Sequence, residues 1–90
     1  MSDDTMNQLR RYAELLSDVN CLKVIYYLYK FNPNIPIEDL STNLDLSKET
    51  IIRCLDRLLS ANIVLKTDVG RYSLTVFGRT AFKKLIQSPQ

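Results

Sequence analysis

The chain has 90 residues, of which 46% are hydrophobic and 24% charged, and its net charge is +2. This length fits one globular domain with a modest core, and no apolar run approaches the roughly 20 residues of a membrane span. The acidic start Met1–Asp4 lacks the apolar core of a signal peptide. We therefore expect a single cytoplasmic domain over residues 1–90, with frayed ends at 1–3 and 88–90.

Metal and catalytic sites are not expected. The chain has no histidine and two cysteines, Cys21 and Cys54, whose spacing fits no metal site. The favoured interpretation is that both are small core residues, and a disulfide between them requires an oxidising compartment or a thermophilic cell. No phosphate-binding loop or nucleophile motif is present, so we expect no enzyme, no metal and no cofactor.

Charge is unevenly divided along the chain. Residues 1–47 hold four basic and seven acidic residues, a net charge of −3, whereas residues 48–90 hold eight basic and three acidic ones, a net charge of +5. A half-basic chain suits a protein with one face on a polyanion. The alternative is chance variation in a small chain.

The first half of the chain predicts two helices. In the first, over about residues 4–16, Met6, Leu9, Ala13 and Leu16 are in phase, and Tyr12 adds to them. After a break at 16–18, where either Ser17 or Asp18 can cap the next element, a helix is predicted over Val19–Lys30. It is apolar almost all round, so we expect it to be the central buried helix.

A helix-turn-helix is predicted next. Residues 31–36 contain two prolines and two asparagines and are expected to form a loop. A short helix over 37–44 follows, then a tight turn at Asp45–Leu46. Ser47 is a good N-cap for a second helix, and Asn62 tolerates the left-handed conformation that ends one. Two helices joined by such a turn make a helix-turn-helix.

The helix after Ser47 is amphipathic. One side carries the residues expected to be buried, namely Ile51, Cys54, Leu55, Leu58 and Asn62. The opposite side carries Glu49, Ile52, Arg53, Asp56 and Ser60, with Arg57 at its edge. We interpret this outward side as a surface that lies in the major groove of DNA; the alternative is an ordinary solvated helix face.

After Asn62 the period changes to that of strands. Residues 63–67 and 71–75 read as two strands joined by a turn at 68–70, where Gly70 can take positive φ. Thr75 then caps a last helix over 76–86. The expected fold is mainly α with a small β-hairpin, in the order α-α-α-α-β-β-α.

These segments together resemble the winged helix-turn-helix domain of the arsenic-repressor-like (ArsR) family of bacterial and archaeal transcription regulators. The resemblance covers roughly residues 15–82: Leu16-Ser17-Asp18 before an apolar helix, Ser47 to Val64 like the family's recognition helix, and Tyr72-Ser73-Leu74-Thr75 like its closing motif. The family's metal-sensing cysteines would fall near residues 37–40, where this chain has none. The resemblance therefore implies the fold and DNA binding without metal sensing.

Candidate DNA contacts follow from the amphipathic helix and the hairpin. Arg53 and Lys48 are the best readers of base edges, although Arg53 can instead pair with Glu49 or Asp56. Ile52 can touch a thymine methyl group or be an isolated exposed residue. The full set of expected contacts is Ser47, Lys48, Glu49, Thr50, Ile52, Arg53 and Arg57 on the helix, with Lys66 and Arg71 on the wing.

The terminal helices are expected to form a dimer. The helix-turn-helix core uses only part of their apolar faces, which leaves Leu9, Tyr12, Leu16, Phe82, Leu85 and Ile86 for a partner. The related family pairs through its terminal helices. The function predicted is a homodimeric, sequence-specific regulator of transcription that binds double-stranded DNA. The alternative is a winged-helix module that binds protein in a larger assembly, which the acidic residues on the outward face favour.

Overall fold

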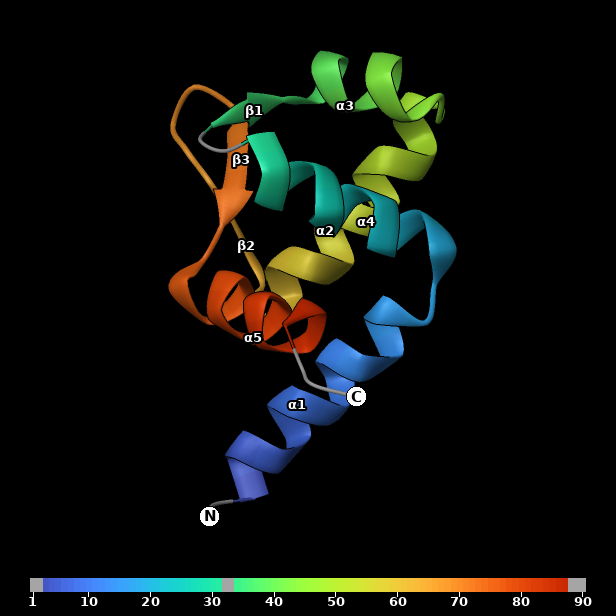
Figure 1. Ribbon diagram of the computed structural model, residues 1–90. Coiled ribbons are helices and arrows are strands. Elements are labelled where there is room, and N and C mark those ends of the chain that lie inside the picture. Colours follow the sequence, from blue (N-terminus) through green and yellow to red (C-terminus); the bar gives the residue numbers. More distant parts are fainter. Residues whose placement is uncertain (1–2, 32–33, 88–90) are drawn as a thin grey trace.

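A computed structural model describes residues 3–31 and 34–87 (Figure 1). The elements within them are α1 (Asp3–Leu16), α2 (Val19–Phe31), β1 (Ile35–Pro36), α3 (Ile37–Leu44), α4 (Lys48–Ser60), β2 (Val64–Lys66), β3 (Arg71–Leu74) and α5 (Val76–Ile86). Residues 1–3 and 88–90 were expected to be frayed. All of them except Asp3 lie outside the described residues, and α1 begins at Asp3. In the part of the chain that the structure describes, no helix is long and apolar enough to cross a membrane.

The centre of the fold is a core shared by α2 and α4. Cys21, Val24, Ile25 and Leu28 of α2 are buried, as are Ile51, Cys54, Leu55 and Leu58 of α4. Both cysteines are free thiols. Burial, together with the neighbouring Cys54 thiol, raises the pKa of Cys21 to about 12, so at neutral pH Cys21 is an uncharged core residue.

Helix α2 is the central helix, as its composition predicts, but it is not buried on every side. Leu22 and Tyr26 are 38% and 49% exposed, and they share the outer side of the helix with Lys23. A domain of this size has too few elements to surround any helix completely. One side of α2 therefore faces outward even though its sequence is apolar.

The start of α2 is tied to α4 by one side chain. Of the two expected caps, Asp18 is the one used: its Oδ1 accepts from the backbone N–H groups of Asn20 at 2.9 Å and Cys21 at 3.3 Å. Its Oδ2 accepts from Arg57 Nη1 of α4 at 3.0 Å. The hydrogen bond from the Cys21 backbone, followed by the one from Arg57, lowers the pKa of Asp18, so the carboxylate stays charged at neutral pH.

Helix α1 buries Tyr12 and Leu15, while Met6 and Leu9 are 47% and 42% exposed. The predicted apolar phase of this helix, which included Met6 and Leu9 and omitted Leu15, is therefore partly wrong. The reason is a specific contact: the Tyr12 hydroxyl donates to the Gly78 carbonyl of α5 at 2.8 Å, and this bond turns α1 toward α5. Figure 1 shows the first half of α1 projecting away from the body of the molecule.

The sheet has three antiparallel strands in the order β1-β3-β2, where two were predicted. Ile35 pairs with Tyr72 and Pro36 with Arg71, so part of the expected 31–36 loop is an edge strand. A two-residue strand has no alternating pattern to detect, and proline is tolerated at an edge. The residues of that loop at positions 32 and 33 lie outside the described part.

The hairpin and the last helix begin and end close to the predicted positions. Strand β2 pairs with β3 from Val64–Leu74 to Lys66–Tyr72, and Gly70 in the turn has a φ of 77°. The Thr75 hydroxyl accepts from Gly78 N–H at 2.9 Å and donates to the Asn62 carbonyl at 2.7 Å. One residue therefore caps α5 and holds it against the end of α4.

Replacing Gly78 by alanine tests the close approach of α5 to the strand entrance. A Cβ there would overlap the backbone carbonyl of Ile63, so the backbone must shift. We expect Gly78→Ala to lower the free energy of unfolding by about 1–3 kcal/mol in urea titrations. Lys83→Ala, at an exposed position of the same helix, is the control and should stay within about 0.5 kcal/mol of the wild type. Equal stability of the two variants would show that α5 does not sit this close.

Candidate nucleic-acid interface

The turn between α3 and α4 is fixed by two features. Asp45 takes the left-handed conformation at φ 55° and ψ 47°, and its N–H donates to the Ser41 carbonyl. The Ser41 hydroxyl also donates to the Leu46 carbonyl at 2.7 Å. The sequence predicts Asp45 in this turn. The role of Ser41 was missed, although a serine in the last turn of a helix could have indicated it.

Helix α4 starts and stops as its sequence predicts. The Ser47 hydroxyl accepts from Thr50 N–H at 3.2 Å and lies 3.0 Å from the Thr50 hydroxyl. At the other end Asn62 has a φ of 61°, just beyond the last helical residue, Ser60. These two caps set the length of the exposed face that α4 can offer to a ligand.

The outward face of α4 is polar except at one position. Glu49, Arg53 and Asp56 are exposed, and Ile52 between them is 45% exposed. The expected alternative for Arg53, an ion pair with Glu49 or Asp56, is not formed: within residues 3–31 and 34–87 the ion pairs are Lys48–Glu38 and Arg57–Asp18. The Arg53 guanidinium thus has no protein partner among these residues and is available to a ligand.

Lys48 stands at the first turn of α4 and faces α3. Its Nζ lies 3.8 Å from Glu38 Oε2, and both side chains are well exposed. An exposed pair at this distance is weak, so a phosphate can compete for the ammonium group. Lys48 therefore remains a candidate contact, with Glu38 as a competitor that was not foreseen.

Arg57 differs from the other predicted contacts because its guanidinium is directed toward α2, although the side chain is 47% exposed. Its Nη1 lies 3.0 Å from Asp18 Oδ2 and 3.8 Å from the Cys21 sulfur. The amphipathic pattern placed Arg57 at the edge of the outward face, and the partner that draws it away is 39 residues distant in sequence. The structure thus gives Arg57 a role in tying α4 to α2.

Both predicted basic residues of the hairpin lie on its strands. Lys66 of β2 holds its Nζ 5.9 Å from the centroid of the Tyr72 ring, a cation–π distance. Arg71 begins β3, and its Nη1 donates to the Asn34 carbonyl at 3.3 Å. Both residues are exposed, so each charge remains accessible to phosphate.

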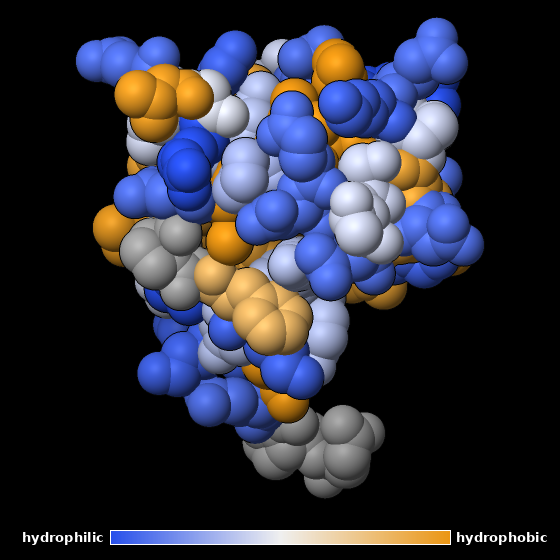
Figure 2. Space-filling model, turned by 90° about the horizontal axis from the view of Figure 1, so that it is seen from above, coloured by the Kyte–Doolittle hydropathy of each residue, from blue (hydrophilic) through white to orange (hydrophobic). Residues whose placement is uncertain are grey.

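In Figure 1 the hairpin turn and the first turns of α4 lie at the same, upper end of the molecule. Figure 2 views that end from above and shows hydrophilic side chains over most of it, with small apolar patches between them. A broad polar surface of this kind is suited to a hydrated, charged partner such as a nucleic acid.

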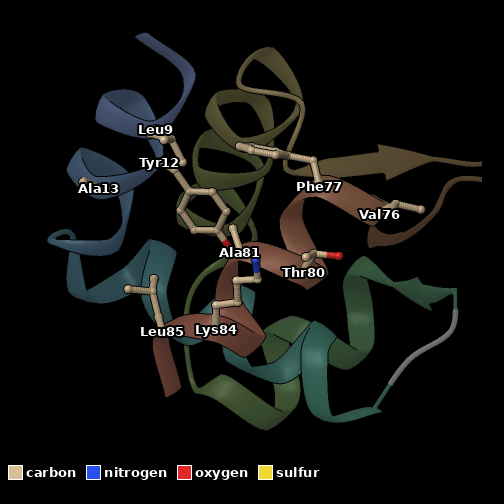
Figure 3. A pocket seen from close by; sticks show the side chains of 9 residues that line it. All are labelled: Leu9, Tyr12, Ala13, Val76, Phe77, Thr80, Ala81, Lys84 and Leu85. Carbon is tan, nitrogen blue, oxygen red and sulfur yellow. The ribbon is translucent and has the colours of Figure 1, made fainter. Parts of the chain in front are cut away.

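A second, apolar surface lies between α1 and α5 (Figure 3). It is a groove of about 670 Å³ lined by Leu9, Tyr12, Ala13, Val76, Phe77, Thr80, Ala81, Lys84 and Leu85. The rings of Tyr12 and Phe77 meet edge to face on its floor, 5.7 Å between centroids. We call it the α1–α5 groove.

The residues expected at a dimer interface divide into two groups. Leu9, Leu85 and Ile86 are 42%, 54% and 52% exposed. Tyr12 and Phe82 are 2% and 4% exposed and belong to the protomer's own core, which Leu16 also packs against. Any partner on the α1–α5 groove therefore contacts chiefly its exposed aliphatic side chains, which are Leu9, Leu85 and the 85% exposed Val76.

Comparison with known proteins identifies the family to which this fold belongs. The profile of the winged helix-turn-helix DNA-binding family matches residues 20–64, from α2 to the start of β2. No curated protein matches the chain, whereas eight chains of known structure do.

One of these structures is the solution NMR structure of the homodimeric winged helix-turn-helix DNA-binding domain, residues 1–100, of Mb0332 from Mycobacterium bovis, described as a possible ArsR-family transcriptional regulator. The match covers 97% of this chain and 84% of that one, with 17% identity and a TM-score of 0.73. At this identity the likeness establishes the fold. Because the family profile spans half of the chain and includes its helix-turn-helix, the chain belongs to the winged helix-turn-helix DNA-binding family.

Proposed function

We propose that this protein is a cytoplasmic, sequence-specific regulator of transcription that binds double-stranded DNA as a homodimer, and is a binding protein rather than an enzyme. In this proposal α4 enters the major groove with its outward face, and the β2–β3 hairpin acts as the wing on the DNA backbone. The observation that carries the proposal is Arg53 at the middle of that face, which has no ion-pair partner within residues 3–31 and 34–87. Arginine is the residue best suited to guanine in the major groove.

The acidic residues on the same face are consistent with sequence-specific binding. Glu49 and Asp56 are exposed on either side of Arg53 along α4. They repel phosphate, so they weaken binding to arbitrary sequences, but a carboxylate can accept from the amino group of cytosine. Such a surface gains its affinity only at sites with matching bases.

Arg53 and Arg71 should differ in what their loss costs. Base contacts specify a site, whereas phosphate contacts position the protein on it. We expect Arg53→Ala to weaken binding to the best site by about 1–3 kcal/mol and to affect random DNA much less. Arg71→Ala should weaken both and lower the slope of log affinity against log salt by about one unit. Fluorescence anisotropy over a salt series measures both quantities.

The two variants also identify the ways in which the proposal fails. If Arg53→Ala leaves the ratio of specific to random affinity intact, Lys48 is the better candidate for the base reader. If neither substitution changes binding at low salt, α4 does not enter a groove, and a protein-binding winged helix describes the chain better. Both side chains are exposed, so thermal stability should be close to wild type in each case.

The homodimer proposal is supported by the α1–α5 groove and by the likeness to a domain whose structure is described as homodimeric. The groove is apolar and open, and a small domain gains stability from covering such a surface. A two-fold arrangement would place the exposed leucines of one protomer in the groove of the other.

Charge placed in the α1–α5 groove should separate the protomers. We expect Leu9→Glu and Leu85→Glu to shift sedimentation equilibrium from dimer to monomer at about 10–50 μM, because a buried unpaired carboxylate is costly. Val69→Glu is the control, since Val69 is 78% exposed in the hairpin turn, outside the groove. A wild-type protein that is monomeric at these concentrations would remove the homodimer from the proposal.

A further inference from the structure

Ile52 is the one large apolar residue of α4 that the fold does not use. Ile51, Leu55 and Leu58 are at most 1% exposed and Leu59 is partly buried against the core, whereas Ile52 is 45% exposed. It does not lie at the margin of the core, because its neighbours on the outward face are Glu49, Arg53 and Asp56. An isolated exposed isoleucine is not unusual, but this one occupies the centre of the face proposed to read DNA.

The major groove of DNA offers one apolar group on which such a side chain can pack. Base edges there present hydrogen-bond donors and acceptors, and the single apolar group is the C5 methyl of thymine. The polar neighbours of Ile52 can satisfy donors and acceptors, but Ile52 itself can gain only from covering a methyl group. A different base opposite Ile52 would leave a polar edge against an aliphatic surface and lose hydration without compensation.

The Ile52 side chain is also conformationally restricted before it binds. A β-branched residue in a helix is held in nearly one χ1 rotamer, so Ile52 loses little entropy when it packs. The long side chain of Arg53, which has no partner among the described residues, can reach a base beyond it. With a rise of about 1.5 Å per residue in the helix and about 3.4 Å per base pair in DNA, neighbouring residues address the same or adjacent base pairs.

We infer that Ile52 is a specificity-determining residue that packs on the C5 methyl of a thymine within about two base pairs of the guanine read by Arg53. The inference rests on the proposed function, because it requires α4 to lie in the major groove. It deepens that function by naming two bases of the half-site: a thymine and a nearby guanine, contacted by the aliphatic side chain of Ile52 and the guanidinium group of Arg53. A dimer would carry the same pair twice.

Deletion of single methyl groups from the DNA tests this inference. The best duplex is first selected from a random library with the wild-type protein, and each thymine is then replaced in turn by deoxyuridine, which removes only the C5 methyl. We expect one position per half-site where the replacement weakens binding roughly fourfold, the factor that burial of one methyl-sized group gives. In Ile52→Ala that sensitivity should disappear, and in Arg53→Ala it should persist while the preference for guanine is lost.

The control protein is Leu22→Ala, since Leu22 is comparably exposed at 38% but lies on α2; it should keep the wild-type sensitivity to the methyl group. A selected site in which every deoxyuridine is tolerated, or one in which Ile52→Ala and the wild type respond equally, overturns the inference and leaves the proposed function standing. If the library yields no enriched sequence at all, sequence-specific reading itself is wrong, and this inference falls with it.

Discussion

The packing of α4 against α2 is the constraint on which the rest of the structure depends. Four side chains of α4, from Ile51 to Leu58, are buried in the core shared with α2, and their spacing leaves a single side of α4 facing outward. Because buried apolar area is the main source of stability, this side cannot be exchanged for another without unfolding the domain. The outward face of α4, which we propose reads DNA, is thus set by burial on the opposite side of the same helix.

Short polar links then fix the position of α4 along and around its axis. Asp18 joins its Arg57 to the start of α2, Ser41 closes the turn before it, and Thr75 connects its end to α5. Asp18 and Thr75 also accept from free backbone N–H groups at the starts of α2 and α5, so groups that a helix leaves unpaired at its end are used where elements meet. A rigid scaffold of this kind is needed where base edges must be met within fractions of an ångström.

Local signals made most of the fold predictable. Ser47, Asn62 and Thr75 act within one turn of their own helix, so the bounds of α4 and α5 could be inferred without knowledge of any partner. The strand at Ile35–Pro36 was missed because it is defined only by its pairing with β3, which lies 35 residues later in the chain. The burial of Tyr12 was unexpected for the same reason, since Gly78 in α5 determines it.

The residues of the candidate site that face outward could also be predicted from the sequence, but their contacts could not. A helical wheel separated the outward residues Glu49, Ile52 and Arg53 from the buried ones, since both groups belong to one helix. It was wrong for Asn62, which is exposed because it lies beyond the end of α4. It could not place Arg57, whose position depends on Asp18, or reveal that Arg53 has no partner within the described residues, because both facts concern distances between side chains.

The central claim, that α4 reads the major groove, is tested most directly by methylation interference on the selected duplex. Dimethyl sulfate modifies guanine at N7, in the major groove, and adenine at N3, in the minor groove. Our account predicts that methylation of at least one guanine N7 per half-site prevents binding by the wild type, and that this interference disappears in Arg53→Ala. Interference confined to adenine N3, or a protein indifferent to every modified base, would contradict it.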